Sequence, residues 1–394
     1  MISVDEALGR LFALCAPVGT EVVPLRRAAG RVLAAPVVAR LNQPPFAASA
    51  MDGYAIREAD HQPGACLNII GEAAAGKGFS GSVGPDQAVR IFTGAPVPKG
   101  AERVILQEDV IREGDRITLG DKLEAATNIR AAGQDFSAGD RIAAPRRLAP
   151  SDLALIAAMN VAEVTVARRP VVALLATGNE LVMPGEVPGP DQIIASNSFA
   201  LGALAEAEGA EVRMLPIARD DAESLRFTLG LAEGADLVVT IGGASVGDHD
   251  LVAPVTEAMG MERSFYKIAM RPGKPLMAGR LGSSILLGVP GNPVSSIVCG
   301  HIFMRPMLRA LQGLPPAPAP VHRARLARPV AANGPRAHYM RARVEAAESG
   351  ARITAFDRQD SALLSVLSEA NALLVRPVGD DARPEGTEVD YIPL

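Results

Sequence analysis

The chain has 394 residues, of which 48% are hydrophobic, and a net charge of -5 from 39 basic and 44 acidic side chains. This length allows about two to four domains, and the even mixture of charges excludes a broad cationic surface for nucleic acid. Three scattered cysteines without CxxC spacing favour a reducing cytoplasm. The N-terminal apolar pattern carries charges, unlike a signal peptide, and no stretch approaches the roughly 20 apolar residues of a membrane span.

The first 168 residues predict a small α/β domain that is interrupted by a β-rich module. Residues 1–40 have helical periodicity followed by short apolar runs, and residues 150–166 return to helix and strand. Between them, runs such as AVRIF and RVILQ are bounded by Gly, Pro, Asp or Asn, as in β-sheet modules. We therefore expect a discontinuous first domain (1–43 and 138–168) with an inserted β-rich domain (44–137).

From residue 170 to about 312 the sequence alternates strand and helix patterns, which indicates a mostly parallel, doubly wound sheet. We predict an α/β domain over 169–313. The proline-rich LPPAPAP segment is a stiff linker, and the short apolar runs after it predict a small β domain over 321–394. The predicted strands lie near 171–176, 211–217, 236–241, 264–269 and 284–289, and the helices near 197–209, 221–233, 250–260 and 293–311.

Three of these strands end in loops of glycine, proline and small polar residues: LLATGNE, TIGGASVGDHD and VPGNPVSS. The carboxyl ends of parallel strands converge and the backbone N–H groups of such loops point outward, so one crevice for a phosphorylated small molecule is expected. Each loop alone is also explained by an ordinary turn into a capped helix. The candidate substrate contacts are Gly242, Gly243, Ser245, Gly247, Pro290, Gly291, Asn292 and Pro293.

Acidic residues stand near the same strand ends. Glu180, Asp220 and Asp250 have no neighbouring histidine or cysteine pattern, and such carboxylates suit a hard cation such as Mg²⁺. Helix capping is the competing role for Asp250 and for one of the adjacent pair Asp220 and Asp221. We take Glu180, Asp220 and Asp250 as candidate metal ligands.

A basic turn, KIAMRPGKP, holds Lys267, Arg271 and Lys274 close together. Such a group suits an oxyanion or pyrophosphate, whereas solvated surface charge is the ordinary explanation. The five histidines lack HExxH spacing, and the chain has neither a Gly-x-Ser-x-Gly elbow nor a Walker loop. Zinc enzymes, triad hydrolases and ordinary kinases therefore lose support.

Two blocks of the β-rich module, PPFAASAMDGYAI and RIFTGAPVPKGAERVILQED, contain Asp52 and Thr93 among small and turn residues. Binding residues usually lie in loops of this kind, although rigid turns explain the composition equally well. In chain order, these blocks, NIRAAGQDFSAGD, the loops above and the tail RQDSALLSVLSEANALLVRP resemble the molybdopterin molybdenumtransferase family, of the MoeA and gephyrin E-domain type. The resemblance spans essentially the whole chain.

The resemblance implies a multidomain α/β plus β protein. Its parts are a small discontinuous linker domain, an inserted β-rich domain, a doubly wound molybdopterin-binding α/β domain and a C-terminal β-barrel-like domain. The implied activity is a cytoplasmic, Mg²⁺-dependent transfer of molybdenum: adenylylated molybdopterin and molybdate give molybdenum cofactor and AMP. The implied catalytic residues are Asp52, Thr93, Asp135, Asp220 and Asp250, with Lys267, Arg271 and Lys274 among the substrate contacts.

The family pattern also implies a homodimer whose active site combines the α/β domain of one protomer with the inserted domain of its partner. A molybdopterin adenylyltransferase and molybdoenzyme-maturation proteins are the further candidate partners. Arg271 stands where lysine is common, which changes the geometry of oxyanion binding. Two other functions stay open: a non-catalytic molybdopterin-binding or scaffolding protein, and a molybdopterin adenylyltransferase or nucleotide hydrolase that shares only the α/β domain.

Overall fold

The computed structural model describes residues 1–243, 251–348 and 350–394. Within these ranges, no helix combines the length and the hydrophobicity needed to cross a membrane. The chain forms two compact units, and strands β1 (Thr20–Pro24) and β14 (Glu163–Ala167) contain points at which it passes from one to the other. The larger unit comprises Met1–Glu21, Gly30–Ala34 and Val166–Leu394, and the smaller unit comprises Val22–Ala29 and Ala35–Thr165.

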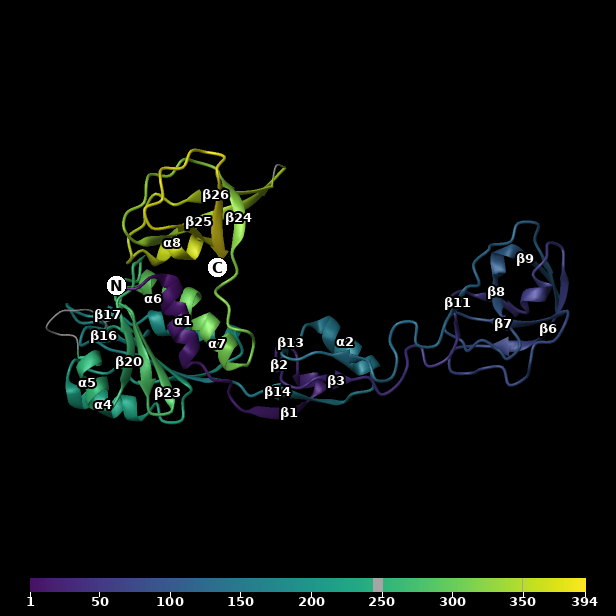
Figure 1. The fold of residues 1–394 in the computed structure, drawn as a ribbon, viewed down its shortest axis with the longest axis horizontal. Coiled ribbons are helices and arrows are strands. Elements are labelled where there is room, and N and C mark those ends of the chain that lie inside the picture. Colours follow the sequence, from purple (N-terminus) through teal and green to yellow (C-terminus); the bar gives the residue numbers. More distant parts are fainter. Residues whose placement is uncertain (244–250, 349) are drawn as a thin grey trace. The chain divides into compact units, whose positions relative to one another are not determined.

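Short strands dominate the smaller unit (Figure 1). Its elements are η1 (Leu25–Arg27), β3 (Val37–Val38), β4 (Ala48–Ser49), β5 (Gly53–Ile56), η2 (Glu58–Asp60), β6 (Cys66–Ala73), β7 (Gln87–Ile91), β8 (Arg103–Leu106), η3 (Gln107–Asp109), β9 (Val110–Glu113), β10 (Arg116–Leu119), β11 (Ile129–Arg130), β12 (Arg141–Ile142), β13 (Arg146–Arg147) and α2 (Pro150–Ala158). The main sheet has the order β8-β5-β7-β6-β10-β9, in which β6 and β7 are parallel. Both faces of this sheet are covered, because Tyr54 and Ile56 of β5 join one apolar cluster and Ala55 joins another.

The larger unit contains an α/β domain. The elements of this unit as far as residue 311 are α1 (Val4–Leu14), β2 (Val32–Leu33), β15 (Val171–Ala176), β16 (Leu181–Val182), β17 (Ile193–Ile194), α3 (Asn197–Ala207), β18 (Glu211–Met214), α4 (Ala222–Gly230), β19 (Leu237–Ile241), α5 (Val252–Ala258), β20 (Glu262–Tyr266), β21 (Met270–Arg271), β22 (Met277–Leu281), β23 (Ser284–Val289), α6 (Pro293–Cys299), the π-helical turn η4 (Gly300–Met304) and α7 (Arg305–Leu311). Of these, β2 and β21 lie outside the sheet of the α/β domain. The sheet order is β18-β15-β19-β23-β22-β20, with the first four strands parallel and β22 antiparallel to both neighbours.

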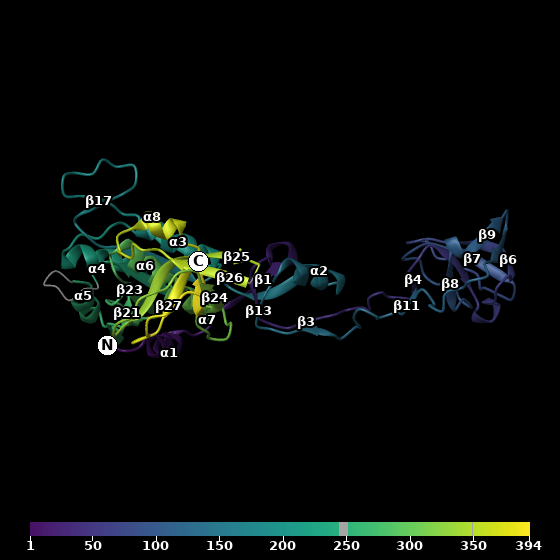
Figure 2. The ribbon, with the colours of Figure 1, turned by 90° about the horizontal axis from the view of Figure 1, so that it is seen from above.

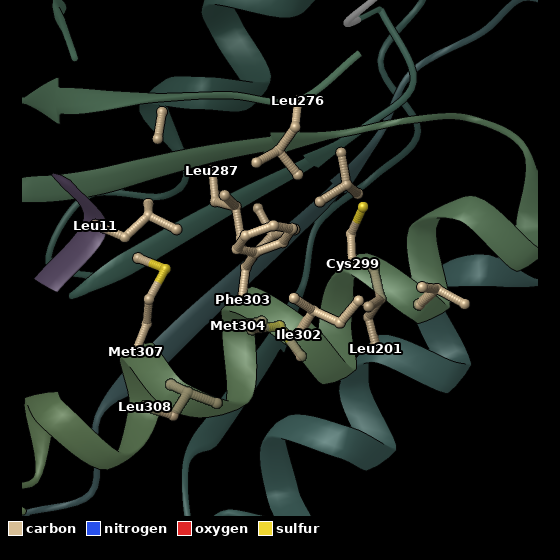
Figure 3. Packing of buried hydrophobic residues seen from close by; sticks show 14 of the residues in the cluster. Leu11, Leu201, Leu276, Leu287, Cys299, Ile302, Phe303, Met304, Met307 and Leu308 are labelled. Atoms are coloured by element: carbon tan, nitrogen blue, oxygen red, sulfur yellow. The ribbon is translucent and has the colours of Figure 1, made fainter. Parts of the chain in front are cut away.

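Helices cover both faces of this sheet, as a doubly wound domain requires. Residues of α1, α3, α6 and α7 share one apolar cluster with alternate strand residues, whereas α4 and α5 share another with the remaining ones. Figure 3 shows Phe303 of η4 pointing toward Leu287 on the sheet. A Cβ on Gly300 would lie 2.6 Å from Cδ2 of Leu201, so α3 and the helix that follows β23 are in close contact. This packing fixes the starts of both helices at the same end of the sheet.

The predicted strands and helices of this domain agree with the structure except at residues 181–194, where β16 and β17 were not predicted, and around residues 262–281. The strand expected near 264–269 is β20, which begins and ends earlier, and neither β21 nor β22 was predicted. β22 and β23 form a hairpin around Gly282, whose φ of 59° suits glycine. The helix predicted over 293–311 is present as α6, η4 and α7.

The C-terminal part of the larger unit is a small barrel. It comprises β24 (His322–Leu326), β25 (Ala337–Ala347), β26 (Gly350–Ala355), α8 (Leu364–Glu369), β27 (Ala372–Arg376) and β28 (Glu388–Pro393). The strand order is β21-β25-β26-β24-β28-β27, and the additional pairing of β25 with β27 closes five strands around an apolar core. The multidomain α/β plus β architecture with a barrel-like C-terminal domain is therefore confirmed.

Candidate active site

A cleft of about 610 Å³ opens at the carboxyl ends of β15, β19 and β23. The loop that follows each strand contributes to it: Thr177, Gly178 and Glu180 after β15, Gly242 and Gly243 after β19, and Pro290, Gly291, Asn292 and Pro293 after β23. The described parts of the three loops thus share one cleft, as expected for loops at the carboxyl ends of parallel strands.

Two glycines allow the floor of this cleft to be built. Gly242 has a φ of 95°, and a Cβ there would lie 2.9 Å from the backbone oxygen of Thr177. Gly178 has a φ of 151°, and a Cβ there would lie 2.4 Å from Oε2 of Glu180. Both backbone conformations are unfavourable for L side chains. Glycine therefore lets the β15 and β19 loops approach each other and leaves room for the Glu180 carboxylate.

Glu180 and Asp220 bring two carboxylates to the cleft, and both side chains are exposed. Asn179 contacts Asp220 twice: its backbone N–H donates to Oδ2 of Asp220 at 3.1 Å, and its Oδ1 accepts from the Asp220 N–H at 3.2 Å. The adjacent Asp221 caps α4 instead, because its Oδ1 accepts from the Ser224 N–H at 2.7 Å. One of the two aspartates is thus a helix cap, as expected, and the other faces the cleft.

The PGNP loop leads directly into α6. Asn292 is the N-cap residue and makes no side-chain capping bond, and Pro293 is the first residue of the helix, where its missing N–H costs nothing. Nδ2 of Asn197, the first residue of α3, donates to the Gly291 oxygen at 2.7 Å. The starts of α3 and α6 are therefore joined at the cleft, where helix dipoles favour a bound anion.

The basic loop contributes to two clefts. Pro275 lines the cleft described above, whereas Arg271 lines a second cleft of about 440 Å³ against the C-terminal barrel. Neither the exposed Lys274 nor the half-buried Lys267 lines either of these two clefts. The polar side chains that line the second cleft with Arg271 include Arg328, Asn333, His338 and Arg376.

Positive charge is concentrated beside this second cleft. Burial, followed by the charges of Arg271 and Arg341, lowers the pKa of His338 to about 4, so its imidazole is neutral at pH 7. Arg341 is fully buried and donates from Nη2 to the backbone oxygens of Arg358 and Asp360 at 3.2 and 2.9 Å. Within the described part of the chain, Nε and Nη1 of Arg341 and Nε2 of His338 have no hydrogen-bond partner.

In the smaller unit, Asp52 and Thr93 form a direct pair. The backbone N–H and the hydroxyl of Thr93 donate to Oδ1 of Asp52 at 2.7 and 2.8 Å. These bonds, with a smaller contribution from the charge of Arg90, hold the pKa of Asp52 below its ordinary value. The Arg90 guanidinium lies 5.1 and 4.7 Å from the ring centres of Tyr54 and Phe92, which restrains it beside Asp52.

Family models match three consecutive parts of the chain. The MoeA N-terminal region (domain I and II) matches residues 2–160, a probable molybdopterin binding domain matches 173–310, and the MoeA C-terminal region (domain IV) matches 323–394. The molybdopterin molybdenumtransferase of Nostoc sp. is 35% identical over 95% of this chain and 89% of its own length. That of Staphylococcus aureus is 30% identical over 99% of this chain and 95% of its own length. The chain belongs to the MoeA family.

Solved MoeA structures have the same fold. The crystal structure of the molybdopterin biosynthesis MoeA protein from Pyrococcus horikoshii OT3 is 29% identical, with a TM-score of 0.85, and the match covers 100% of both chains. The family, recognised from motifs in the sequence, is therefore confirmed.

Several site residues of this MoeA chain belong to the smaller unit or fall outside the described residues. Ser245, Gly247 and Asp250 fall outside them. Asp135 is exposed in the smaller unit, where its backbone N–H donates to the oxygen of Gln43 at 2.9 Å. Among the residues that the structure describes, no group of three His, Cys, Asp or Glu is placed to hold a metal ion.

Sequence reasoning missed part of the MoeA cleft wall. Leu181, Ile193 and Ile194 of the β16–β17 ribbon line the cleft, and so do residues 196–198 at the start of α3. Figure 2 shows the β17 segment and its loop projecting from the α/β domain. Ile193 is 58% exposed, which is unusual for an apolar residue on a strand. The segment QIIAS, directly before the predicted helix at 197, was the available signal.

Proposed function

We propose that this chain is a molybdopterin molybdenumtransferase, which converts adenylylated molybdopterin and molybdate into molybdenum cofactor and AMP. One observation carries the proposal: a single cleft holds the carboxylates of Glu180 and Asp220 together with the Gly242 turn and the starts of α3 and α6. A substrate with a pyrophosphate needs such a combination of backbone donors and cation-binding oxygens. Relatives that carry this enzyme name and align over nearly the whole chain support the proposal.

The donor set of the cleft fits magnesium. Its described lining supplies carboxylate, hydroxyl, amide and backbone oxygens and contains neither histidine nor cysteine, as a hard cation prefers. Glu180 and Asp220 would hold the ion, with Asp250 as the third carboxylate proposed from the sequence. Bound there, Mg²⁺ would neutralise charge on the pyrophosphate as AMP leaves. The N–H groups at the start of α6 would bind the phosphate oxygens.

The proposal assigns molybdate to the basic loop. Arg271 and Pro275 are four residues apart and line the two clefts, so one short loop serves both. Guanidinium groups bind oxyanions through paired N–H donors, and Arg271 and Arg328 line the second cleft. His338 adds no charge there at pH 7, because burial and the neighbouring arginines lower its pKa.

The proposal includes a cytoplasmic homodimer with a shared active site. The Thr93 bonds hold the pKa of Asp52 below its ordinary value, and the carboxylate would act in the site of the partner subunit. A molybdopterin adenylyltransferase, as the source of the adenylylated substrate, and molybdoenzyme-maturation proteins are the proposed further partners.

The test measures, by chromatography, the release of AMP from adenylylated molybdopterin in the presence of Mg²⁺, with and without molybdate. We expect Asp220→Ala to abolish release, since this carboxylate faces the cleft. Asp221→Ala is the matched control: it removes a helix cap, costs about 1 kcal/mol of stability and retains release. AMP release that does not depend on molybdate, or an active Asp220→Ala variant, would contradict the proposal. Tight binding without turnover would favour a scaffolding protein, and ATP-dependent adenylylation of free molybdopterin would favour an adenylyltransferase.

A further inference from the structure

We propose that Asn179 is a positioning residue that fixes the Asp220 carboxylate at the cleft. The inference rests on the proposed function, in which Asp220 holds a divalent cation. Asn179 itself touches no substrate in this account. Its backbone N–H donates to Oδ2 of Asp220, and its side-chain Oδ1, the group that a substitution removes, accepts from the Asp220 N–H.

The register of the sheet places these two residues opposite each other. β15 and β18 pair in parallel as far as Leu174 and Met214, and the pairing resumes at the bridge between Thr177 and Ala218. Asn179 and Asp220 are each two residues beyond that bridge, so they occupy the next equivalent positions. Each of the two bonds joins the backbone N–H of one residue to a side-chain oxygen of the other, and together they continue the pairing beyond the last backbone bridge.

The bonds occupy one oxygen of the carboxylate and leave the other. Oδ2 of Asp220 accepts from the Asn179 N–H, and among the residues that the structure describes no donor reaches Oδ1. Oδ1 of Asn179 at the same time accepts from the Asp220 N–H, which keeps the Asp220 backbone beside the Asn179 N–H that holds the carboxylate. An exposed aspartate would otherwise sample several rotamers, and holding it in one removes that entropy cost from cation binding. Asparagine provides the acceptor without adding a second charge beside Asp220.

The chain offers a control with the same local chemistry. Asn371 in the barrel is exposed and makes two side-chain hydrogen bonds with one partner: its Nδ2 donates to the Val344 oxygen at 2.9 Å and its Oδ1 accepts from the Val344 N–H at 2.7 Å. Asn371→Ala therefore removes two side-chain bonds away from the cleft, one more than Asn179→Ala removes. A purely structural role of Asn179 would make the two alanine variants behave alike.

The experiment titrates Mn²⁺, a spectroscopic substitute for Mg²⁺, into the full chain and follows free Mn²⁺ by electron paramagnetic resonance. We expect Asn179→Ala to weaken binding about tenfold or more, with Asn371→Ala unchanged. Asn179→Asp retains the acceptor for the Asp220 N–H and should restore wild-type affinity or better. Thermal unfolding of each variant confirms that the fold is intact.

The outcomes separate this inference from the function on which it rests. If the unmodified chain binds Mn²⁺ and releases AMP, Asp220→Ala loses both and Asn179→Ala binds like the unmodified chain, then the positioning role is wrong and the proposed function stands. Equal weakening in Asn179→Ala and Asn371→Ala would also overturn it. If the unmodified chain neither binds Mn²⁺ nor releases AMP, the proposed function fails and this inference fails with it.

Discussion

Gly242 offers a direct test of how the cleft floor is built. It has a φ of 95° and is buried where the β19 loop meets the β15 loop. Gly185, in the exposed loop between β16 and β17, has the same φ of 95°, and a Cβ there would meet no atom within 4 Å. Alanine would meet the same positive φ at the two positions, and the two variants differ in the contact that a Cβ would make.

The magnitudes follow from these two geometries. A non-glycine residue in such a conformation costs about 1–3 kcal/mol, and this term applies to both variants. At Gly242 the new Cβ would lie 2.9 Å from the Thr177 backbone oxygen and 3.0 Å from its Oγ1, so the loop must shift. Overpacking of this kind adds about 1–3 kcal/mol. We expect Gly242→Ala to destabilise the α/β domain by that additional amount relative to Gly185→Ala.

Urea unfolding of both variants measures the difference, with hydrogen exchange of β15 and β19 peptides to locate it. AMP release should fall in Gly242→Ala, because the displaced loop lines the cleft, and persist in Gly185→Ala. Equal stability of the two variants, or full activity of Gly242→Ala, would refute the reasoning that the close approach of these loops shapes the site.

Three further predictions concern charge and the shared site. Co-expressed Asp52→Ala and Asp220→Ala chains should recover about a quarter of wild-type AMP release, since half of randomly paired dimers are mixed and each mixed dimer has one intact site; no recovery would argue against a shared site. Arg271→Ala should raise the molybdate concentration for half-maximal release while Arg271→Lys keeps part of the affinity, and an unchanged molybdate response would remove Arg271 from the site. Burial, and then the charge of Arg305, lowers the pKa of His301 to about 4 from an ordinary 6.5, so stability present above pH 6.5 is lost as the pH falls toward 4. Between pH 7 and 5 this loss of unfolding free energy is about 2 kcal/mol. Urea unfolding should show that His301→Gln lacks this dependence on pH, whereas the exposed His322→Gln keeps it.

The sequence predicted the parts of the fold in which local pattern and tertiary packing agree. The apolar runs at 171–176 and 284–289 became β15 and β23 with the predicted bounds, because both are central strands that are buried almost throughout. The convergence of three strand-ending loops followed from the geometry of parallel strands. The sequence also predicted that one of the two residues Asp220 and Asp221 caps a helix, although only the structure shows that Asp221 caps α4.

Other features depend on contacts between segments that are distant in sequence. β22 contains Gly279 and Arg280 among its five residues and becomes a strand by pairing on both sides, with β20 and β23. The turn at Gly282 was a hairpin signal that the prediction overlooked. Arg271 lines a different cleft from Pro275 because β21 pairs with β25 of the barrel, where Arg271 is opposite His338. No local pattern in KIAMRPGKP contains that information.

A crystal structure of the chain with adenylylated molybdopterin and Mg²⁺ tests the central claim most directly. The account predicts that the pyrophosphate lies in the cleft at the ends of β15, β19 and β23, between the carboxylates of Glu180 and Asp220 and the start of α6. Electron density for the pyrophosphate in the second cleft, which is lined by Arg328 and His338, with the first cleft empty, would contradict this account.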